Sequence, residues 1–175
     1  MTEWLPRLAK MRKPTYLAGG SSTCALTTGG AVKCWGSNNF GQLGDNTGVT
    51  PVSPAMQRVD GTTVNWNSIT SGDTNVCAIR DSTTTPAITG GLWCWGGNDF
   101  GQVGDGTFNT ELTPIHIGAA SDWSAVDAGN SHTCGIRAGA LYCWGAGADY
   151  RTGLGSIDDT NAPTQVGSAT DWGSV

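Results

Sequence analysis

The tripeptide Cys-Trp-Gly occurs three times in this chain, beginning at Cys34, Cys94 and Cys143. Each copy lies between the same landmarks in the same order: a glycine and a second cysteine come before it, and a glycine-rich turn, a proline and a lone tryptophan come after it. A repeat of about 50 residues predicts an array of one supersecondary unit, because each unit buries its apolar face only against its neighbours.

We place the three units at about residues 16–66, 67–123 and 124–175, after a separate segment 1–15. Within each unit, runs of four to six β-branched, aromatic or apolar residues are bounded by glycine, which is the pattern of short strands. With 27 glycines in 175 residues, the chain is predicted to be a turn-dense all-β protein.

Each unit also contains a pair of cysteines, on the two arms of a predicted hairpin. The longest spacing between paired cysteines coincides with the longest turn, from Asp81 to Gly91, so the pair keeps its register across the strands. Neighbouring antiparallel strands bring such residues within disulfide reach. We therefore expect the pairs Cys24–Cys34, Cys77–Cys94 and Cys134–Cys143 to be disulfides, with free buried cysteines as the alternative.

A metal site is the weaker interpretation of these cysteines. The chain has no Cys-x-x-Cys motif, and the two histidines, His116 and His132, have no repeated counterpart. No metal and no cofactor are expected, and no catalytic constellation is recognisable, so we do not expect an enzyme.

The tryptophans fall into three sets. Those of the triplets alternate with a cysteine, so the two side chains should face opposite sides of the sheet. A second set is predicted to begin strands and to pack between units. Trp93 stands where the other copies have Lys33 and Tyr142, which makes it a candidate for an exposed contact. The first two sets are Trp35, Trp95 and Trp144, and Trp66, Trp123 and Trp172.

Charge is unevenly spread along the chain. Residues 1–15 carry a local excess of positive charge, and Trp4, Leu8 and Met11 there have the spacing of a short amphipathic helix, with a frayed tail as the alternative. The rest of the chain is acidic, which disfavours nucleic-acid binding. No apolar run is long enough to span a membrane, and no signal peptide is recognisable. Paired cysteines nevertheless favour an extracellular or cell-surface location.

The motifs resemble the repeats of the regulator-of-chromosome-condensation family, in particular the bacterial form. The matching stretches are Ser22–Leu26, Trp93–Asn98 and Gly101–Thr107. The resemblance implies a β-propeller in which each repeat forms one four-stranded blade, usually in a ring of seven. Three repeats would form an arc, a partial propeller that other chains could complete.

The two ends of the repeat region look like complementary halves of one unit. Tyr16 and Leu17 belong to the end of a strand whose beginning corresponds to Trp172–Val175. We expect these segments to complete one another between chains, giving a ring or a filament, unless the sequence is a fragment.

The third turn departs from the motif. It is longer, and it presents Asp149, Tyr150 and Arg151, which we single out with Trp93 as partner or ligand contacts, against an ordinary solvated loop. The predicted function is a non-enzymatic interaction or structural module that self-associates head to tail. The alternative is a secreted, lectin-like propeller that binds glycans through loop aromatics. Nucleotide exchange on chromatin is disfavoured by the acidic body.

Overall fold

A computed structural model describes residues 15–47, 52–59, 65–81 and 90–175. The helix expected within residues 1–15 and most of the long turn after Asp81 lie outside the described residues. The described part of the chain contains no helix with the length and apolar character of a membrane span.

The described strands form three antiparallel sheets of four strands each. We call these sheets blades 1, 2 and 3. Blade 1 consists of β1 (Thr15–Gly19), β2 (Ser22–Leu26), β3 (Val32–Ser37) and β4 (Val52–Arg58). Blade 2 consists of β5 (Trp66–Ser71), β6 (Asn75–Arg80), β7 (Gly91–Gly96) and β8 (Glu111–His116). Blade 3 consists of β9 (Trp123–Ala128), β10 (His132–Arg137), β11 (Ala140–Gly145) and β12 (Thr160–Gln165).

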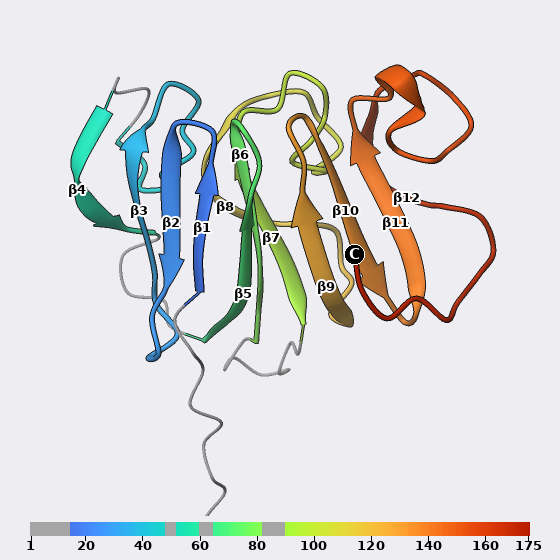
Figure 1. Cartoon of the computed structure of the whole chain (residues 1–175), viewed down its shortest axis with the longest axis horizontal. Coiled ribbons are helices and arrows are strands. Elements are labelled where there is room, and N and C mark those ends of the chain that lie inside the picture. The colour runs from blue at the N-terminus through green and yellow to red at the C-terminus, as the bar shows by residue number, and fades with distance from the viewer. Residues whose placement is uncertain (1–14, 48–51, 60–64, 82–89) are drawn as a thin grey trace, which may run out of the picture.

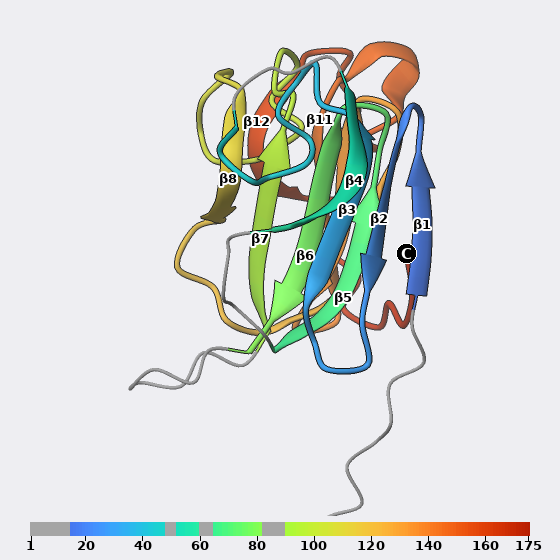
Figure 2. The ribbon, with the colours of Figure 1, turned by 90° about the vertical axis from the view of Figure 1, so that its left-hand side faces the viewer.

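The blades follow one another in chain order, as the colours in Figure 1 show. Figure 2, seen from the side of blade 1, shows the sheets stacked one behind another. The first strand of each later blade packs against the preceding blade: β5 contacts β1 and β2, and β9 contacts β5 and β6. This is the packing of an arc of propeller blades, so the predicted all-β partial propeller is confirmed.

The cysteine pairs lie directly opposite one another in the central hairpin of each blade, in the registers Cys24 to Cys34, Cys77 to Cys94 and Cys134 to Cys143. All three pairs form disulfides, and the described residues contain no free cysteine. Each bond closes a short loop inside one blade, which in the chain-entropy description stabilises the fold by about 3 kcal/mol.

The apolar core lies between the blades and forms two clusters. Cys94 belongs to the cluster between blades 2 and 3, whereas its neighbour Trp95 belongs to the cluster between blades 1 and 2. The prediction that these two side chains face opposite sides of the sheet is therefore confirmed.

The prediction for the lone tryptophans is confirmed at two positions. Trp66 and Trp123 are the first residues of β5 and β9, so each begins a new blade. Trp172 lies in no strand of the single chain, and the strand that we expect there between chains stays a prediction.

Candidate functional site

We call the interfaces between consecutive blades seams: the first seam joins blades 1 and 2, and the second joins blades 2 and 3. One backbone contact occurs at both. The amide of Trp66 donates to Gly30 O at 3.1 Å, and the amide of Trp123 donates to Gly90 O at 3.0 Å. The amide of Trp172 donates in the same way to Gly139 O at 3.0 Å. Trp172 therefore occupies the corresponding position on the far side of blade 3, although it lies outside a strand.

A second contact joins the triplet tryptophan to the glycine-rich turn of the preceding blade. Trp95 Nε1 donates to Gln42 O, and Trp144 Nε1 donates to Gln102 O, each at 3.0 Å. A Cβ atom at Gly44 would lie only 2.6 Å from Trp95 Nε1. A Cβ atom at Gly104 would lie 2.5 Å from Trp144 Nε1. These glycines therefore do more than permit a turn: they leave space for the tryptophan of the next blade.

The same elements are present, without a partner blade, on the two outer faces of the described arc. Trp35 on blade 1 is half-buried, whereas Trp95 and Trp144 are fully buried. On blade 3, Gly153 takes the place of Gly44 and Gly104: it has positive φ, its amide donates to Tyr150 O three residues earlier, and a Cβ atom built on it would meet only the side chain of Val166 within 4 Å. We call the face of blade 1 that carries Trp35 the leading face, and the face of blade 3 that carries Cys134 and Cys143 the trailing face.

The first seam is filled by aromatic and basic side chains. Trp66 packs against Trp93 and Trp95, with ring centroids 6.4 and 6.0 Å away. The Arg80 guanidinium lies 3.6 Å from the centre of the Trp93 ring, and the His116 ring lies 4.9 Å away on the same indole. Burial, followed by the charge of Arg80, lowers the pKa of His116 below its usual value.

These contacts correct one expectation about Trp93. Predicted to be exposed, it is half-buried and packs against the core cluster of the first seam. The sequence comparison with Lys33 and Tyr142 identified an unusual position but could not show that Arg80 and His116 flank the indole. A ligand contact by Trp93 stays a prediction.

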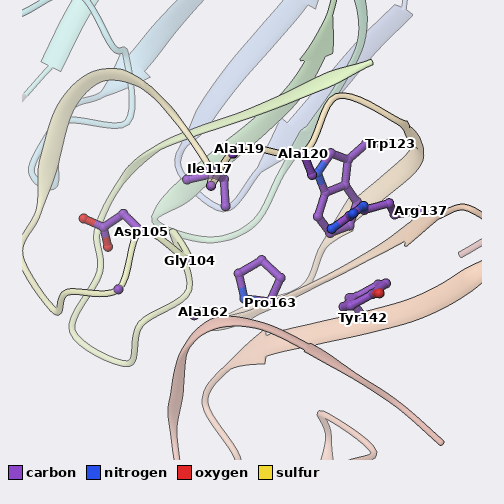
Figure 3. Close-up of a pocket in the computed structure, with 12 residues that line it drawn as sticks. Gly104, Asp105, Ile117, Ala119, Ala120, Trp123, Arg137, Tyr142, Ala162 and Pro163 are labelled. Atoms are coloured by element: carbon purple, nitrogen blue, oxygen red, sulfur yellow. The ribbon is translucent and has the colours of Figure 1, made fainter. Parts of the chain in front are cut away.

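The second seam has the same layout but contains a pocket of about 490 Å³. Trp123 packs against Tyr142 and Trp144, with centroids 5.6 and 5.9 Å away. Arg137, at the position of Arg80, instead donates through Nε to Asp122 Oδ1 at 2.6 Å. Figure 3 shows Trp123 and Arg137 at one end of the pocket, and Tyr142 and Pro163 opposite Asp105 and Ile117.

The sequence alone did not reveal this pocket. The available signal was a set of differences between equivalent positions. Asp122 stands where blade 2 has Asn65, immediately before the first tryptophan, and Tyr142 stands where blade 2 has Trp93. These differences can be interpreted only once the structure shows that both residues lie beside the same pocket.

The predicted contact residues Asp149, Tyr150 and Arg151 lie together at the short 3₁₀ helix η1 (Ala148–Tyr150). Arg151 Nη2 is 3.0 Å from Asp149 Oδ2, and Arg151 Nε donates to Ala148 O at 2.7 Å. The Tyr150 side chain is 62% exposed. The structure thus places the three residues side by side at the surface, and their role in contacting a partner stays a prediction.

The residues expected to complete strands between chains lie in the edge strand β1 of blade 1 and in the segment after β12. Tyr16 and Leu17 belong to β1, whose only pairing partner among the described strands is β2. Trp172 and Val175 are 43% and 46% exposed. The described residues contain no cluster of three or more histidine, cysteine, aspartate or glutamate residues that could hold a metal ion.

Comparison with known proteins shows similarity to regulator of chromosome condensation (RCC1) repeats. Two family models of this repeat match residues 89–136 and 18–42. The human E3 ubiquitin-protein ligase HERC2 is 28% identical over 101 residues, which is 57% of this chain and 2% of that protein. The human probable E3 ubiquitin-protein ligase HERC4 is 30% identical over 101 residues, 57% of this chain and 9% of that protein.

Solved structures show the same fold. Yeast RCC1 (Prp20), in a crystal structure bound to Kap60, superposes with a TM-score of 0.76 and 24% identity, over 88% of this chain and 37% of that one. Human WBSCR16 gives a TM-score of 0.71 and 22% identity, over 88% of this chain and 39% of that one. The chain thus spans well under half the length of these relatives. Two stretches of the chain thus match the RCC1 repeat, and its three blades have the fold of the corresponding part of these β-propellers.

Proposed function

We propose that this protein is a non-enzymatic protein-interaction module whose copies associate head to tail. The observation that supports this is the uncovered seam half on each side of the arc. The leading face offers Trp35, the counterpart of Trp95 and Trp144, and the trailing face offers the turn at Gly153, the counterpart of Gly44 and Gly104.

The internal seams define the contact expected between copies. In both, the indole of the triplet tryptophan donates to the carbonyl two residues before the turn glycine, at 3.0 Å. The equivalent bond would join Trp35 Nε1 of one copy to Arg151 O of the next. Tyr16 and Leu17 on one copy, and Trp172 and Val175 on the other, are the proposed points of strand completion beside it.

Known relatives support a role in protein binding without identifying the partner. Prp20p from Saccharomyces cerevisiae, whose crystal structure has the same fold, binds Gsp1p and histones. That protein is 24% identical and is covered only to 38%, so its partners do not transfer to this chain. The three disulfides favour an oxidising compartment, and we propose an extracellular or cell-surface location.

Sedimentation velocity over a range of protein concentrations tests self-association. We expect a concentration-dependent mass above 18.0 kDa for the unmodified chain. Gly153→Leu should remove the association, because a side chain there occupies the space that the partner's indole needs. A strictly monomeric unmodified chain at all concentrations would contradict the proposal.

Gly167→Leu is the matched control for Gly153→Leu. Both glycines have positive φ, +69° and +62°; an added Cβ would meet only the flexible end of Val166 at Gly153, and nothing within 4 Å at Gly167. The two variants therefore carry a similar backbone cost, but only Gly153 lies at the proposed contact. Equal loss of association in both variants would show that the backbone, and not the seam, is responsible.

A second candidate, glycan binding through loop aromatics, is favoured by the exposure of Tyr150. The carboxylate of Asp149 and the guanidinium of Arg151 lie beside it. If this loop binds glycans, Tyr150→Ala should abolish the signal on a glycan array, and Trp93→Ala should not, because Trp93 packs into the first seam.

A further inference from the structure

The pocket of the second seam is a site distinct from the outer faces and from the loop at Tyr150. Its volume of about 490 Å³ lies in the range typical of small-molecule sites. Residues of both blades line it: Gly104 to Gly106 and Ile117 to Ala120 come from blade 2 and its connections, and Arg137, Tyr142 and Pro163 come from blade 3.

Two residues that surround the pocket differ from their counterparts in the first seam. There, the indole of Trp93 carries Arg80 stacked over it at 3.6 Å. In the second seam the smaller phenol of Tyr142 takes the place of the indole, and Asp122 holds the guanidinium of Arg137 at 2.6 Å. The arginine of the second seam therefore does not cover the aromatic ring beside the pocket as Arg80 does in the first seam.

The walls combine aromatic surface with mixed hydrogen-bonding groups. Trp123, Tyr142, Ile117 and Pro163 provide apolar surface. Arg137 donates to Asp122 through Nε only, so its Nη groups have no protein acceptor among the described residues. The Trp123 indole N–H also has no acceptor within the described part of the chain, but it is buried inside the wall and does not face the open space.

The carboxylates complete this arrangement. Asp122, beside Arg137, is half exposed and supplies acceptor oxygens next to guanidinium donors. Asp105 also lines the pocket, but it already accepts from Asn98 Nδ2 and from the backbone and hydroxyl of Thr107. A guanidinium with free donors and a carboxylate beside it therefore lie next to the aromatic wall, although Asp122 itself is not a lining residue.

We propose that this pocket binds a neutral saccharide. Each sugar hydroxyl both donates and accepts, as the neighbouring groups of Arg137 and Asp122 require, and the C–H face of a sugar ring packs on an aromatic ring such as Tyr142. The paired Asp122 offsets the charge of Arg137, and the repeat body is acidic, so an anionic ligand is disfavoured. The proposal does not depend on self-association.

Titration of the full chain with neutral methyl glycosides and N,N′-diacetylchitobiose tests the proposal, with glucuronate as the anionic comparison. The readout is the set of indole N–H signals in ¹H–¹⁵N spectra. We expect one neutral probe to bind with a Kd of about 1 mM or tighter and to shift the Trp123 signal but not that of Trp66. If no neutral probe shifts Trp123, or if glucuronate binds more tightly, the proposal is overturned.

Two variants locate the binding. Tyr142→Trp introduces the indole found at the equivalent position in the first seam and should weaken binding by at least about tenfold. Trp93→Tyr makes the reverse change at the first seam and should leave binding unchanged. If Tyr142→Trp binds as the unmodified chain does, the sugar lies elsewhere and the proposal fails. The dispersion of the other indole signals reports whether each variant is folded, and Arg137→Gln supplies a second test should Tyr142→Trp unfold.

Discussion

The two seams of this molecule have the same construction but different contents. Both carry a strand-opening tryptophan, a triplet tryptophan bonded to the preceding turn, and an arginine at the end of the second strand. In the first seam the arginine stacks on an indole, and in the second it pairs with an aspartate. Repeated structure thus fixes how the blades join, and single residue differences decide whether the arginine covers an aromatic ring or pairs with an aspartate beside the pocket.

The largest expected difference between the seams is in the cost of removing the strand-opening tryptophan. Truncating a buried tryptophan costs about 3–5 kcal/mol, through lost burial and the cavity that remains. Trp66 is fully buried and flanked by Trp93, Trp95 and Arg80, whereas Trp123 borders an existing pocket. We expect Trp66→Ala to lower the free energy of unfolding more than Trp123→Ala, as measured by urea denaturation with the disulfides intact. The opposite order would contradict this contrast between the two seams.

A smaller effect, of opposite sign in the two seams, is expected from exchanging Trp93 and Tyr142, the residues that precede Cys94 and Cys143. Tyr142→Trp fills part of the pocket and should stabilise the fold by about 0.5–2 kcal/mol. Trp93→Tyr removes aromatic surface from beneath Arg80 and should destabilise the fold by about 1 kcal/mol. The midpoints of urea unfolding measure both, and shifts in the same direction would show that the seams do not differ in packing.

Replacing Asp122, the residue before Trp123, should change the free energy of unfolding by a still smaller amount. Asp122→Asn removes the charge that holds Arg137, which should then move over the aromatic rings as Arg80 does in the first seam. Because the ion pair is well exposed, we expect a change in the free energy of unfolding below about 1 kcal/mol. The clearer signal is quenching or a shift of tryptophan fluorescence, and an unchanged spectrum would argue against the role assigned to Asp122.

The seams should also differ in their response to pH, because His116 lies in the first seam and Gln165 takes its place in blade 3. The pKa of His116 is lowered from 6.5 by burial and then by Arg80, so the unfolded chain takes up the proton first as the pH falls. The stability contributed by neutral His116 is complete above about pH 6.5 and is lost below it. His116→Gln should reduce this acid sensitivity, measured as the loss of unfolding free energy on acidification.

His132 responds in the same direction as His116, since burial and then Arg151 lower its pKa while Asp127 opposes them. The His116→Gln variant retains His132, so it separates the first seam from this other source of acid sensitivity. Equal loss of stability in the variant and the unmodified chain would show that His116 is not responsible.

Much of the fold is predictable from the sequence because it depends on order and spacing. The cysteine spacings predict the three hairpin disulfides, and the alternation of Cys94 with Trp95 predicts that they face different blades. These properties are local to one hairpin, and the repetition of the same landmarks supports each one independently.

The candidate sites depend on contacts between units, and there the sequence is less informative. Gly44 reads as a turn glycine, although the indole of Trp95 in the next blade also requires it. Trp93 reads as exposed because its neighbours Arg80 and His116 come from other strands. The pocket depends on Asp122 drawing Arg137 aside, which no spacing in the sequence reveals.

The most direct test of the central claim, that the uncovered seam halves join separate copies, is hydrogen exchange of the Trp35 indole N–H as a function of protein concentration. The Trp95 and Trp144 indoles serve as internal references, because each donates a buried hydrogen bond within the chain. We predict that both references are protected at every concentration, and that Trp35 becomes protected only as the chains associate. Rapid exchange of Trp35 at all concentrations, with the two references protected, would contradict head-to-tail association through the seams.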